Sequence, residues 1–282
     1  MNMRIAFQGE RGAFSEQAAY QLMGHKIDLV PCENFEKTFQ AVARGQAKAC
    51  VVPVENTLAG SIHKNLDLLL QHRFNIGGET NVRIEHHLIG LKGTSLRQIE
   101  RIISHPVALE QCQKFLRRHP HIRSEAAYDT AGSVKLIVNQ GWRNTAAIAG
   151  TRAAQWYRCK ILERNIEDHH ENHTRFWLLY KSSPKRRRLD RQVPGTQNAD
   201  KTSIVFSTRN VPGSLFKCLS VFALRDINLT KIESRPVEGR PFEYYFYVDF
   251  LGNPLEERCE NALHHLGEVT DFLRVLGCYP RG

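Results

Sequence analysis

The sequence predicts an α/β protein of two domains, and three observations support this prediction. Residues 1–180 alternate short apolar runs, typical of strands, with stretches of helical periodicity. Residues 201–282 follow a different order, strand, helix, strand, strand, helix, strand. Between them, residues 182–200 hold two Pro, a Gly and the basic run Lys185–Arg188, which is typical of a linker. A chain of 282 residues is long enough to form two cores.

In the first domain, each apolar run ends in polar or turn residues and is followed by a helical pattern. Side chains suited to capping mark three helix starts, at Ser15, Asn34, and Asp129 or Thr130. This alternation favours mostly parallel sheets. The expected strands are 4–9, 26–32, 48–56, 82–91, 101–106, 145–150 and 174–180, and the expected helices are 16–23, one after Asn34, 61–72, 107–118 and 131–139.

The second domain has the βαββαβ order of a ferredoxin-like unit. Its first helix places Leu215, Leu219 and Phe222 on one face. Residues 201–282 carry 10 basic and 10 acidic residues without a cluster of titratable groups, which favours ligand sensing or assembly over chemistry. The expected strands are 202–208, 227–237, 243–251 and 271–279, and the expected helices are 213–226 and 254–267.

Composition indicates an ordinary globular protein, with 41% hydrophobic and 24% charged residues. No run approaches the roughly 18 apolar residues that a membrane span requires. The N-terminus enters an apolar strand directly, so we expect no export and a cytoplasmic location. Seven Cys without a CxxC pair favour reduced thiols over a zinc ribbon or a redox site.

The net charge of +10 lies in the first domain and the linker, so a uniform nucleic-acid-binding surface is not expected. The excess in the first domain suits an anionic small substrate about as well as a nucleic acid. The basic run Lys185–Arg188 has two interpretations, an anionic-surface patch and a solvated linker, and the lack of interleaved aromatic residues favours the linker.

Several local patterns lack the spacing that their chemistry requires. Gly9 and Gly12 do not complete a dinucleotide-binding fingerprint, although a turn and a helix start at this point suit a carboxylate. The His-rich stretch 169–173 does not match the zinc protease motif, and we expect no metal and no cofactor.

Polar side chains gather where three strands meet a helix or a turn, and together they indicate a binding site. Glu55, Asn56 and Ser61 follow one apolar run, Thr130 starts a helix, and Thr174 and Arg175 precede the run FWLLY. Ligands of α/β sheets bind at the carboxyl ends of strands.

The same segments closely resemble monofunctional prephenate dehydratases that carry a C-terminal ACT domain. Thr174–Phe176 and Glu233–Pro236 match the two signatures of this family. The resemblance rests on GERGAFSEQAA (9–19), VPVENTLAGSI (52–62), DTAGSVK (129–135), NIEDHHENHTRFWLL (165–179), VPGSLFKCL (211–219) and INLTKIESRP (227–236).

The resemblance implies a two-lobed dehydratase domain, similar to the type II periplasmic-binding fold, over residues 1–181. The chain would cross between the lobes near residue 80 and return near residue 175. A linker over 182–200 and a regulatory ACT domain over 201–282 would follow.

The implied reaction converts prephenate to phenylpyruvate, water and carbon dioxide. We expect Thr174 to polarise the leaving hydroxyl and Arg175 to bind the side-chain carboxylate of the substrate. Glu55, Asn56, Ser61 and Thr130 would supply further polarity to the pocket. Two alternatives remain at this point, the same chemistry on arogenate and a non-catalytic amino-acid sensor.

The resemblance also implies that L-phenylalanine binds the ACT domain as an allosteric effector. The chain would then form a homodimer or a homotetramer, because ACT domains of this type pair across subunits. The candidate effector-binding residues lie on the VPGSLF turn and the ESRP strand, and they are Gly213, Ser214, Leu215, Asn228, Glu233, Ser234, Arg235 and Pro236.

Overall fold

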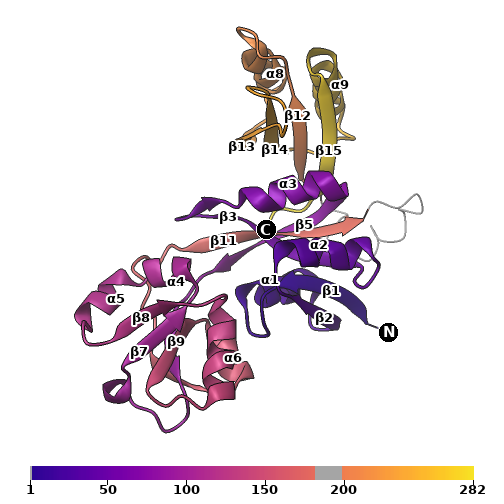
Figure 1. Ribbon diagram of the computed structural model, residues 1–282. Coiled ribbons are helices and arrows are strands. Elements are labelled where there is room, and N and C mark those ends of the chain that lie inside the picture. Colours follow the sequence, from indigo (N-terminus) through magenta and orange to yellow (C-terminus); the bar gives the residue numbers. More distant parts are fainter. Residues whose placement is uncertain (1, 182–198) are drawn as a thin grey trace. The chain divides into compact units, whose positions relative to one another are not determined.

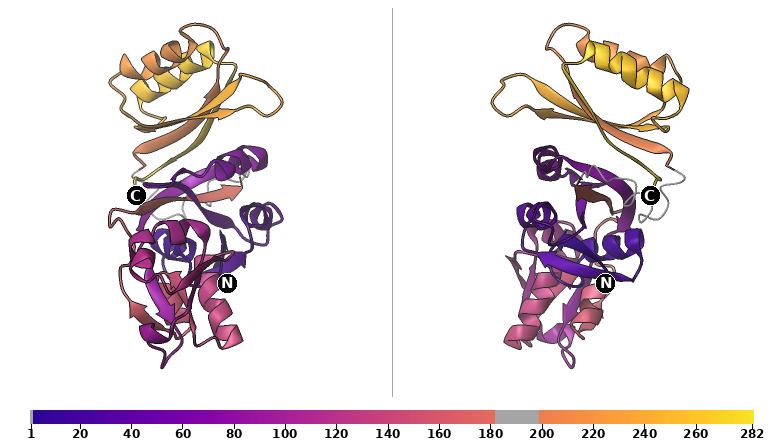
Figure 2. Two further views of the ribbon diagram at one scale, coloured as in Figure 1. Left: turned by 60° about the vertical axis from the view of Figure 1, so that its left-hand side comes forward. Right: turned by 90° about the vertical axis from the view of Figure 1, so that its right-hand side faces the viewer.

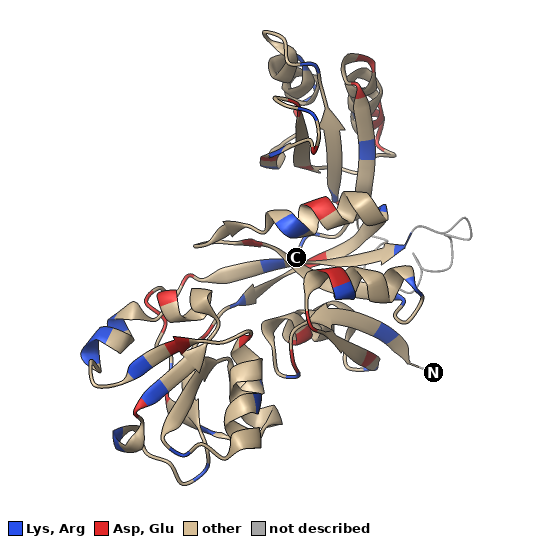
Figure 3. Ribbon diagram, in the orientation of Figure 1, with Lys and Arg blue, Asp and Glu red and all other residues tan. Residues whose placement is uncertain are grey.

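The computed structural model describes residues 2–181 and 199–282, so the basic run Lys185–Arg188 lies outside the described residues. The chain forms two compact units, Met1–Leu68 with Thr80–Trp177, and Leu69–Glu79 with Leu178–Gly282. No helix in the described part is long and apolar enough to cross a membrane. Figure 3 shows Lys and Arg interspersed with Asp and Glu along the elements.

The first sheet has the strand order β2-β1-β3-β11-β5, with the short β4 paired to β3. Strand β1 pairs in parallel with both β2 and β3, because the intervening helices return the chain to the same edge. The strands are β1 (Met3–Gln8), β2 (Ile27–Cys32), β3 (Ala49–Asn56), β4 (Gly60–Ser61), β5 (Phe74–Arg83) and β11 (His173–Lys181), and the helices are α1 (Phe14–Met23), α2 (Phe35–Ala43) and α3 (His63–His72).

The second sheet has the order β10-β6-β9-β7-β8. Figure 1 shows its strands β9, β7 and β8 side by side. Its elements are β6 (His87–Gly90), a 3₁₀ turn (Leu96–Gln98), β7 (Arg101–Ser104), α4 (Pro106–Glu110), α5 (Gln113–Arg118), β8 (Arg123–Ala126), α6 (Thr130–Gln140), β9 (Thr145–Ala149), α7 (Thr151–Trp156) and β10 (Lys160–Glu163).

The prediction of mostly parallel sheets is wrong for this second lobe. Strand β7 pairs in parallel with β8 and β9, but β6 pairs antiparallel with β9 and β10. Strands β9 and β10 are joined through α7 and run parallel to each other on either side of β6, whereas β6 enters from the first lobe in the opposite direction.

Three local predictions also differ from the structure. The expected strand over 82–91 is two strands, because residues 84–86 leave one sheet before β6 begins in the other. The expected helix over 107–118 is divided between α4 and α5. Ser15 caps no helix, since α1 begins one residue earlier with Ala13 as its N-cap.

Two connections join the lobes, residues 84–86 and residues 164–172, and they are hydrogen-bonded to each other. Ile84 N donates to Asn172 O at 2.8 Å, and Ile166 N donates to His86 O at 2.9 Å. The two connections therefore lie side by side, and they lead directly into β6 and β11.

The second unit contains a ferredoxin-like sheet with the order β13-β14-β12-β15, and its three strand pairs are all antiparallel. Helices α8 and α9 cover one face of this sheet (Figure 2). The elements are β12 (Lys201–Ser207), α8 (Ser214–Ala223), β13 (Leu229–Pro236), β14 (Tyr244–Leu251), α9 (Glu257–Val269) and β15 (Phe272–Tyr279). The sequence predicts Leu219 on the buried face of α8. Leu219 is only partly buried, and the fully buried residues of this helix are Cys218, Val221 and Phe222.

Candidate active site

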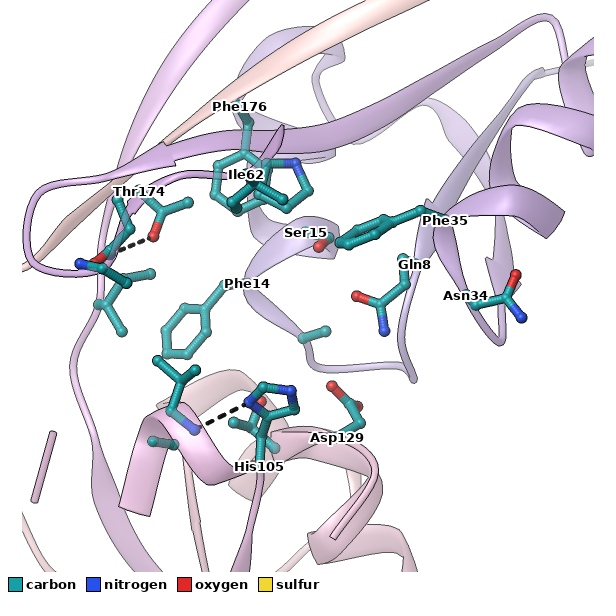
Figure 4. A pocket seen from close by; sticks show the side chains of 18 of the residues that line it. Gln8, Phe14, Ser15, Asn34, Phe35, Ile62, His105, Asp129, Thr174 and Phe176 are labelled. Carbon is teal, nitrogen blue, oxygen red and sulfur yellow. Dashed lines mark hydrogen bonds between the residues drawn. The ribbon is translucent and has the colours of Figure 1, made fainter. Parts of the chain in front are cut away.

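A cleft of about 440 Å³ lies between the two lobes of the first unit (Figure 4). Its residues come from the strands and helix starts of the first lobe, from the helix starts of the second lobe and from the connection 84–86, so each lobe supplies one wall. Six apolar side chains form much of the lining, and they are Phe14, Phe35, Ile62, Ile84, Val107 and Phe176. A ring-sized apolar ligand with polar ends fits such a cleft.

Five helices start at this cleft, because the first turns of α1, α2, α3, α4 and α6 all contribute lining residues. Asn34, His105 and Asp129 each cap their own helix by accepting a backbone N–H. Helix α1 begins at Ala13 without a side-chain cap. The N–H of Glu16 donates to Ala13 O at 3.1 Å, so the N–H groups of Phe14 and Ser15 are the ones in this turn that can bind an anion.

Thr174 lies in the cleft near the start of β11 and is 8% exposed. Asn56, at the end of β3, donates through Nδ2 to Thr174 Oγ1 at 2.9 Å. The orientation of this amide is determined by its other end, where Oδ1 accepts the N–H groups of Leu58 and Ala59 at 3.0 and 2.8 Å. Since Thr174 Oγ1 already accepts a hydrogen bond, its own proton remains for a ligand.

The hydrogen-bond network continues from Asn56 into the second connection and the second lobe. Asn56 Nδ2 also lies 2.7 Å from Asn172 Oδ1, and Asn172 Nδ2 donates to Gln111 Oε1 at 3.0 Å. The same Gln111 oxygen lies 3.0 Å from His86 Nε2. An amide oxygen only accepts, so the proton of His86 is on Nε2.

His86 lines the cleft and is 2% exposed. Burial lowers its pKa, and the hydrogen bond with Gln111 and the nearby carboxylate of Glu167 oppose this shift. Its Nδ1 is buried without a hydrogen-bond partner among the described residues. A neutral histidine held in this way orients its neighbours and is a poor proton donor near pH 7.

Glu10 connects the lobes across the mouth of the cleft. Its backbone N–H donates to Asp129 Oδ2 at 3.3 Å, and its carboxylate accepts from Lys135 Nζ at 2.9 Å and Tyr128 OH at 3.3 Å. Burial raises the pKa of Asp129, while the N–H of Gly132 at 2.9 Å opposes that shift. These contacts hold the start of α6 against the turn that precedes α1.

The cleft brings together Thr174, Asn56 and Thr130 from the predicted site residues. Glu55, Ser61 and Arg175 are not among the described residues that line it, so the expected carboxylate contact of Arg175 is not supported. Side chains alternate along a strand, and Thr174 and Phe176 occupy the cleft face of β11. Arg175 Nη1 instead lies 3.5 Å from Glu55 Oε2, with its guanidinium 5.3 Å from the ring of Trp177.

Sequence reasoning missed most of the residues from the second lobe and the connections. His86, Gln111 and His105 line the cleft, and Asn172 joins its network. Gln8 also lines it at the carboxyl end of β1, and the rule that ligands bind at strand ends could have found this residue.

In the second unit, a recess of about 400 Å³ lies at the start of α8. Ser214 lines it together with Arg209, Lys217 and Asp271. The other predicted effector residues are outside the lining of this recess: Gly213 is the N-cap of α8 with φ 78°, Leu215 packs on the core, Asn228 precedes β13, and Glu233, Ser234, Arg235 and Pro236 lie on the edge strand β13.

Comparison with known proteins gives the same two parts. Residues 5–184 match the family model for prephenate dehydratase, and residues 202–264 match the model for the ACT domain. The chain is 44% identical over 287 residues to "Arogenate dehydratase/prephenate dehydratase 2, chloroplastic" of Arabidopsis thaliana, covering 99% of this chain and 73% of that protein. Arogenate dehydratase 2 of Petunia hybrida is 44% identical over 292 residues, with 99% and 72% covered.

A solved structure shares the fold over almost the whole chain. The prephenate dehydratase of Arthrobacter aurescens in complex with L-Phe has a TM-score of 0.87 and 30% identity, covering 99% of this chain and 90% of that one. The mixed α/β dehydratase fold with an ACT domain, expected from the resemblance, is confirmed.

The expected cytoplasmic location is contradicted by these relatives. Six of the plant proteins that match 99% of the chain are named chloroplastic, and a chloroplast is a plastid rather than the cytoplasm. Targeting segments are separate from the folded domains, so the apolar residues of the first strand do not determine the compartment. The family match at 44% identity and the shared fold establish that this chain is a lyase of the prephenate and arogenate dehydratase family.

Proposed function

We propose that the cleft catalyses the decarboxylative dehydration of a cyclohexadienol ring, the chemistry that prephenate and arogenate share. The observation that carries this proposal is the hydroxyl of Thr174, buried in the cleft with its oxygen engaged by Asn56 and its proton available. A leaving hydroxyl needs such a donor.

The reaction breaks two bonds of the ring and requires one proton. The electron pair of the bond between C1 and its carboxylate enters the ring, carbon dioxide leaves, and the C4–O bond breaks. The departing oxygen takes a proton and leaves as water, and the ring becomes aromatic. Thr174 donates a hydrogen bond to this oxygen, and proton donation or polarisation of this kind contributes typically ~10²–10⁴ in rate.

The remaining lining supports both ends of such a substrate. Phe14, Phe35 and Phe176 surround a ring with apolar groups, where a carboxylate loses hydration and departs more readily as neutral carbon dioxide. The lining also contains the charged residues Glu33, Glu36 and Lys64, which suit the charged side chain of the substrate.

The proposal is tested by incubating the purified full chain with prephenate and, separately, with arogenate. Formation of phenylpyruvate or phenylalanine, together with carbon dioxide, supports it. Thr174→Ala serves as the negative control because it removes the donor and keeps the apolar lining. Absence of product from both substrates would refute the proposal.

We further propose that L-phenylalanine binds the ACT domain and inhibits the dehydratase, with the chain acting as a homodimer or homotetramer. The ACT match and the L-Phe complex of the Arthrobacter aurescens relative support the effector. The recess at the start of α8, with Arg209 and Lys217 for a carboxylate and Asp271 for an ammonium group, has the chemistry of an amino-acid site.

A further inference from the structure

An ion pair lines the cleft at the starts of α2 and α3. Lys64 Nζ lies 2.5 Å from Glu36 Oε1, and both residues contribute to the lining. Their side chains are 57% and 41% exposed, so both charged groups are accessible to a ligand in the cleft. Exposed ion pairs are weak, so a ligand can replace one partner at little cost.

Helix α2, which holds Glu36 in its first turn, starts at the end of the cleft that lies away from Thr174. Figure 4 shows Thr174 at one end and Phe35 and Asn34 at the other, and Glu36 follows Phe35 in the first turn of α2. In the proposed substrates, the leaving hydroxyl and the three-carbon side chain occupy opposite positions of the ring. A ring with its hydroxyl at Thr174 therefore directs its side chain toward α2.

Glu36 is distinguished from the other carboxylate of this turn by its partner. Glu33 also lines the cleft, but its carboxylate is bound by Lys37, which is not among the described lining residues. Asn34 Oδ1 is occupied by the N–H of Lys37. The hydrogen bond from Lys64 lowers the pKa of Glu36, which keeps this carboxylate ionised near neutral pH.

The side chains of the two substrates differ in charge. Arogenate ends in an ammonium and a carboxylate, whereas prephenate has a keto oxygen in place of the ammonium. We propose that Lys64 binds the side-chain carboxylate of either substrate and that Glu36 binds the ammonium of arogenate, so that this chain prefers arogenate. This inference rests on the proposed function, and it assigns specificity to two residues outside the reacting end.

The test compares kcat/KM for arogenate and for prephenate in the full chain and in variants of three residues. Glu36→Gln should lower the ratio of arogenate to prephenate kcat/KM by about tenfold, because a charge-assisted contact is lost with one substrate only. Lys64→Gln should lower kcat/KM for both substrates. Glu110→Gln, an equally simple charge loss at an exposed residue outside the lining, should leave the ratio unchanged.

The results separate this inference from the proposed function. A wild-type chain that prefers prephenate, or a Glu36→Gln variant with an unchanged ratio, overturns the inference while the dehydratase activity stands. A wild-type chain that converts neither substrate refutes the proposed function and the inference with it. A melting curve of each variant detects a folding defect, because a misfolded variant loses both activities together. If Glu36→Gln misfolds, Glu36→Ala is used to measure the ratio of arogenate to prephenate kcat/KM.

Discussion

At the scale of single residues, Thr174 depends on the group that holds it. Its hydroxyl accepts from Asn56, whose own orientation is determined by two backbone N–H groups of the turn that follows β3. A threonine hydroxyl is a weak acid, so it contributes to the reaction by donating a hydrogen bond in a fixed direction, toward the leaving hydroxyl. That direction is determined by the amide.

Thr174→Ala should lower kcat by a factor of about 10²–10⁴ and change KM little, because the contact forms chiefly in the transition state. Thr174→Ser should retain part of the activity, since it keeps the hydroxyl. Steady-state kinetics with the preferred substrate measures both. Near-normal kcat in Thr174→Ala would show that another group assists the leaving hydroxyl.

Asn56→Asp should reduce kcat nearly as much as Thr174→Ala. Aspartate accepts where asparagine donates, so Thr174 would direct its proton toward residue 56 and away from the substrate. Steady-state kinetics with the preferred substrate measures kcat of Asn56→Asp, and Asn56→Ser is the control with a smaller polar side chain. Full activity in Asn56→Asp would contradict the direction assigned to this hydrogen bond.

His86 should make the protein less stable as the pH is lowered below its ordinary pKa of 6.5. Its folded-state pKa is lowered by burial, so protons bind the unfolded chain more readily, and stability is lost as the pH falls through the folded-state value. Urea unfolding between pH 7.5 and about pH 5 measures this slope. His86→Asn should flatten it in part, because His72 and His87 also have lowered pKa values.

At the scale of elements, the turn before α1 has no room for a side chain at Gly12. Its φ is +88°, and an added Cβ would lie 2.6 Å from Ala153 Cα and 2.9 Å from Ala153 N. Both contacts are with the backbone of α7 in the other lobe, so relief would require a shift between the walls of the cleft.

Gly12→Ala should destabilise the protein by about 2–4 kcal/mol, because positive-φ strain and a backbone clash add. Gly45→Ala is the matched control, since its φ is +75° and its Cβ would meet nothing within 4 Å. The control should cost only about 1–2 kcal/mol. Chemical denaturation of both variants tests the difference, and equal losses would show that the contact with α7 is not tight.

A buried ionic group lies within the second unit. Lys201 Nζ lies 2.8 Å from Glu79 Oε1 and 3.9 Å from Asp249 Oδ2, and none of the three residues is more than 7% exposed. Asp249 also accepts from Ser203 Oγ. The lysine neutralises carboxylates that come from two strands.

Lys201→Met should therefore destabilise the protein by about 3–5 kcal/mol, because it leaves two carboxylates buried without their cation. Arg281→Gln is the control, since that side chain is 58% exposed and its pair with Asp200 contributes roughly 0–1 kcal/mol. Thermal unfolding of both variants at equal concentration provides the comparison. A Lys201→Met protein as stable as Arg281→Gln would show that the carboxylates gain water or protons.

At the scale of the whole molecule, strand β5 connects the second unit to the cleft through the chain itself. Its first residues, up to Glu79, belong to the second unit, and the strand ends at Arg83. The connection that follows contains Ile84 and His86, which line the cleft. Arg274 on β15 donates to the backbone oxygen of Phe74 at the start of this strand. The chain itself therefore leads from the second unit to the lining of the cleft.

L-Phenylalanine should inhibit the full chain, and the coupling should be reciprocal, with substrate weakening phenylalanine binding by the same factor. Ser214→Tyr should abolish inhibition by filling the recess at the start of α8. Leu224→Tyr, just beyond the same helix and 77% exposed, should remain inhibited. Inhibition curves and calorimetric titration give both quantities. Inhibition that persists in Ser214→Tyr would place the effector elsewhere.

Local signals in the sequence determined much of what was predicted correctly. Asn34 and Asp129 cap their helices as expected, because a cap depends only on a side chain and the next three residues. The strand and helix order of the ferredoxin-like domain followed from periodicity alone. Thr174 came from a family signature, and its place in the cleft agrees with that choice.

Only the tertiary structure decided which side chains share the cleft and how they are oriented. Asn56 meets Thr174 across 118 positions of sequence, and Asn172 meets Gln111 across 61, so no local pattern predicts either contact. Arg175 is adjacent to Thr174 in sequence but belongs to the other face of β11, where Glu55 binds it. Residue types alone indicated which polar groups the site could contain. The direction of each hydrogen bond, the protonation of His86 and the partner of each side chain depend on distances that exist only after the chain has folded.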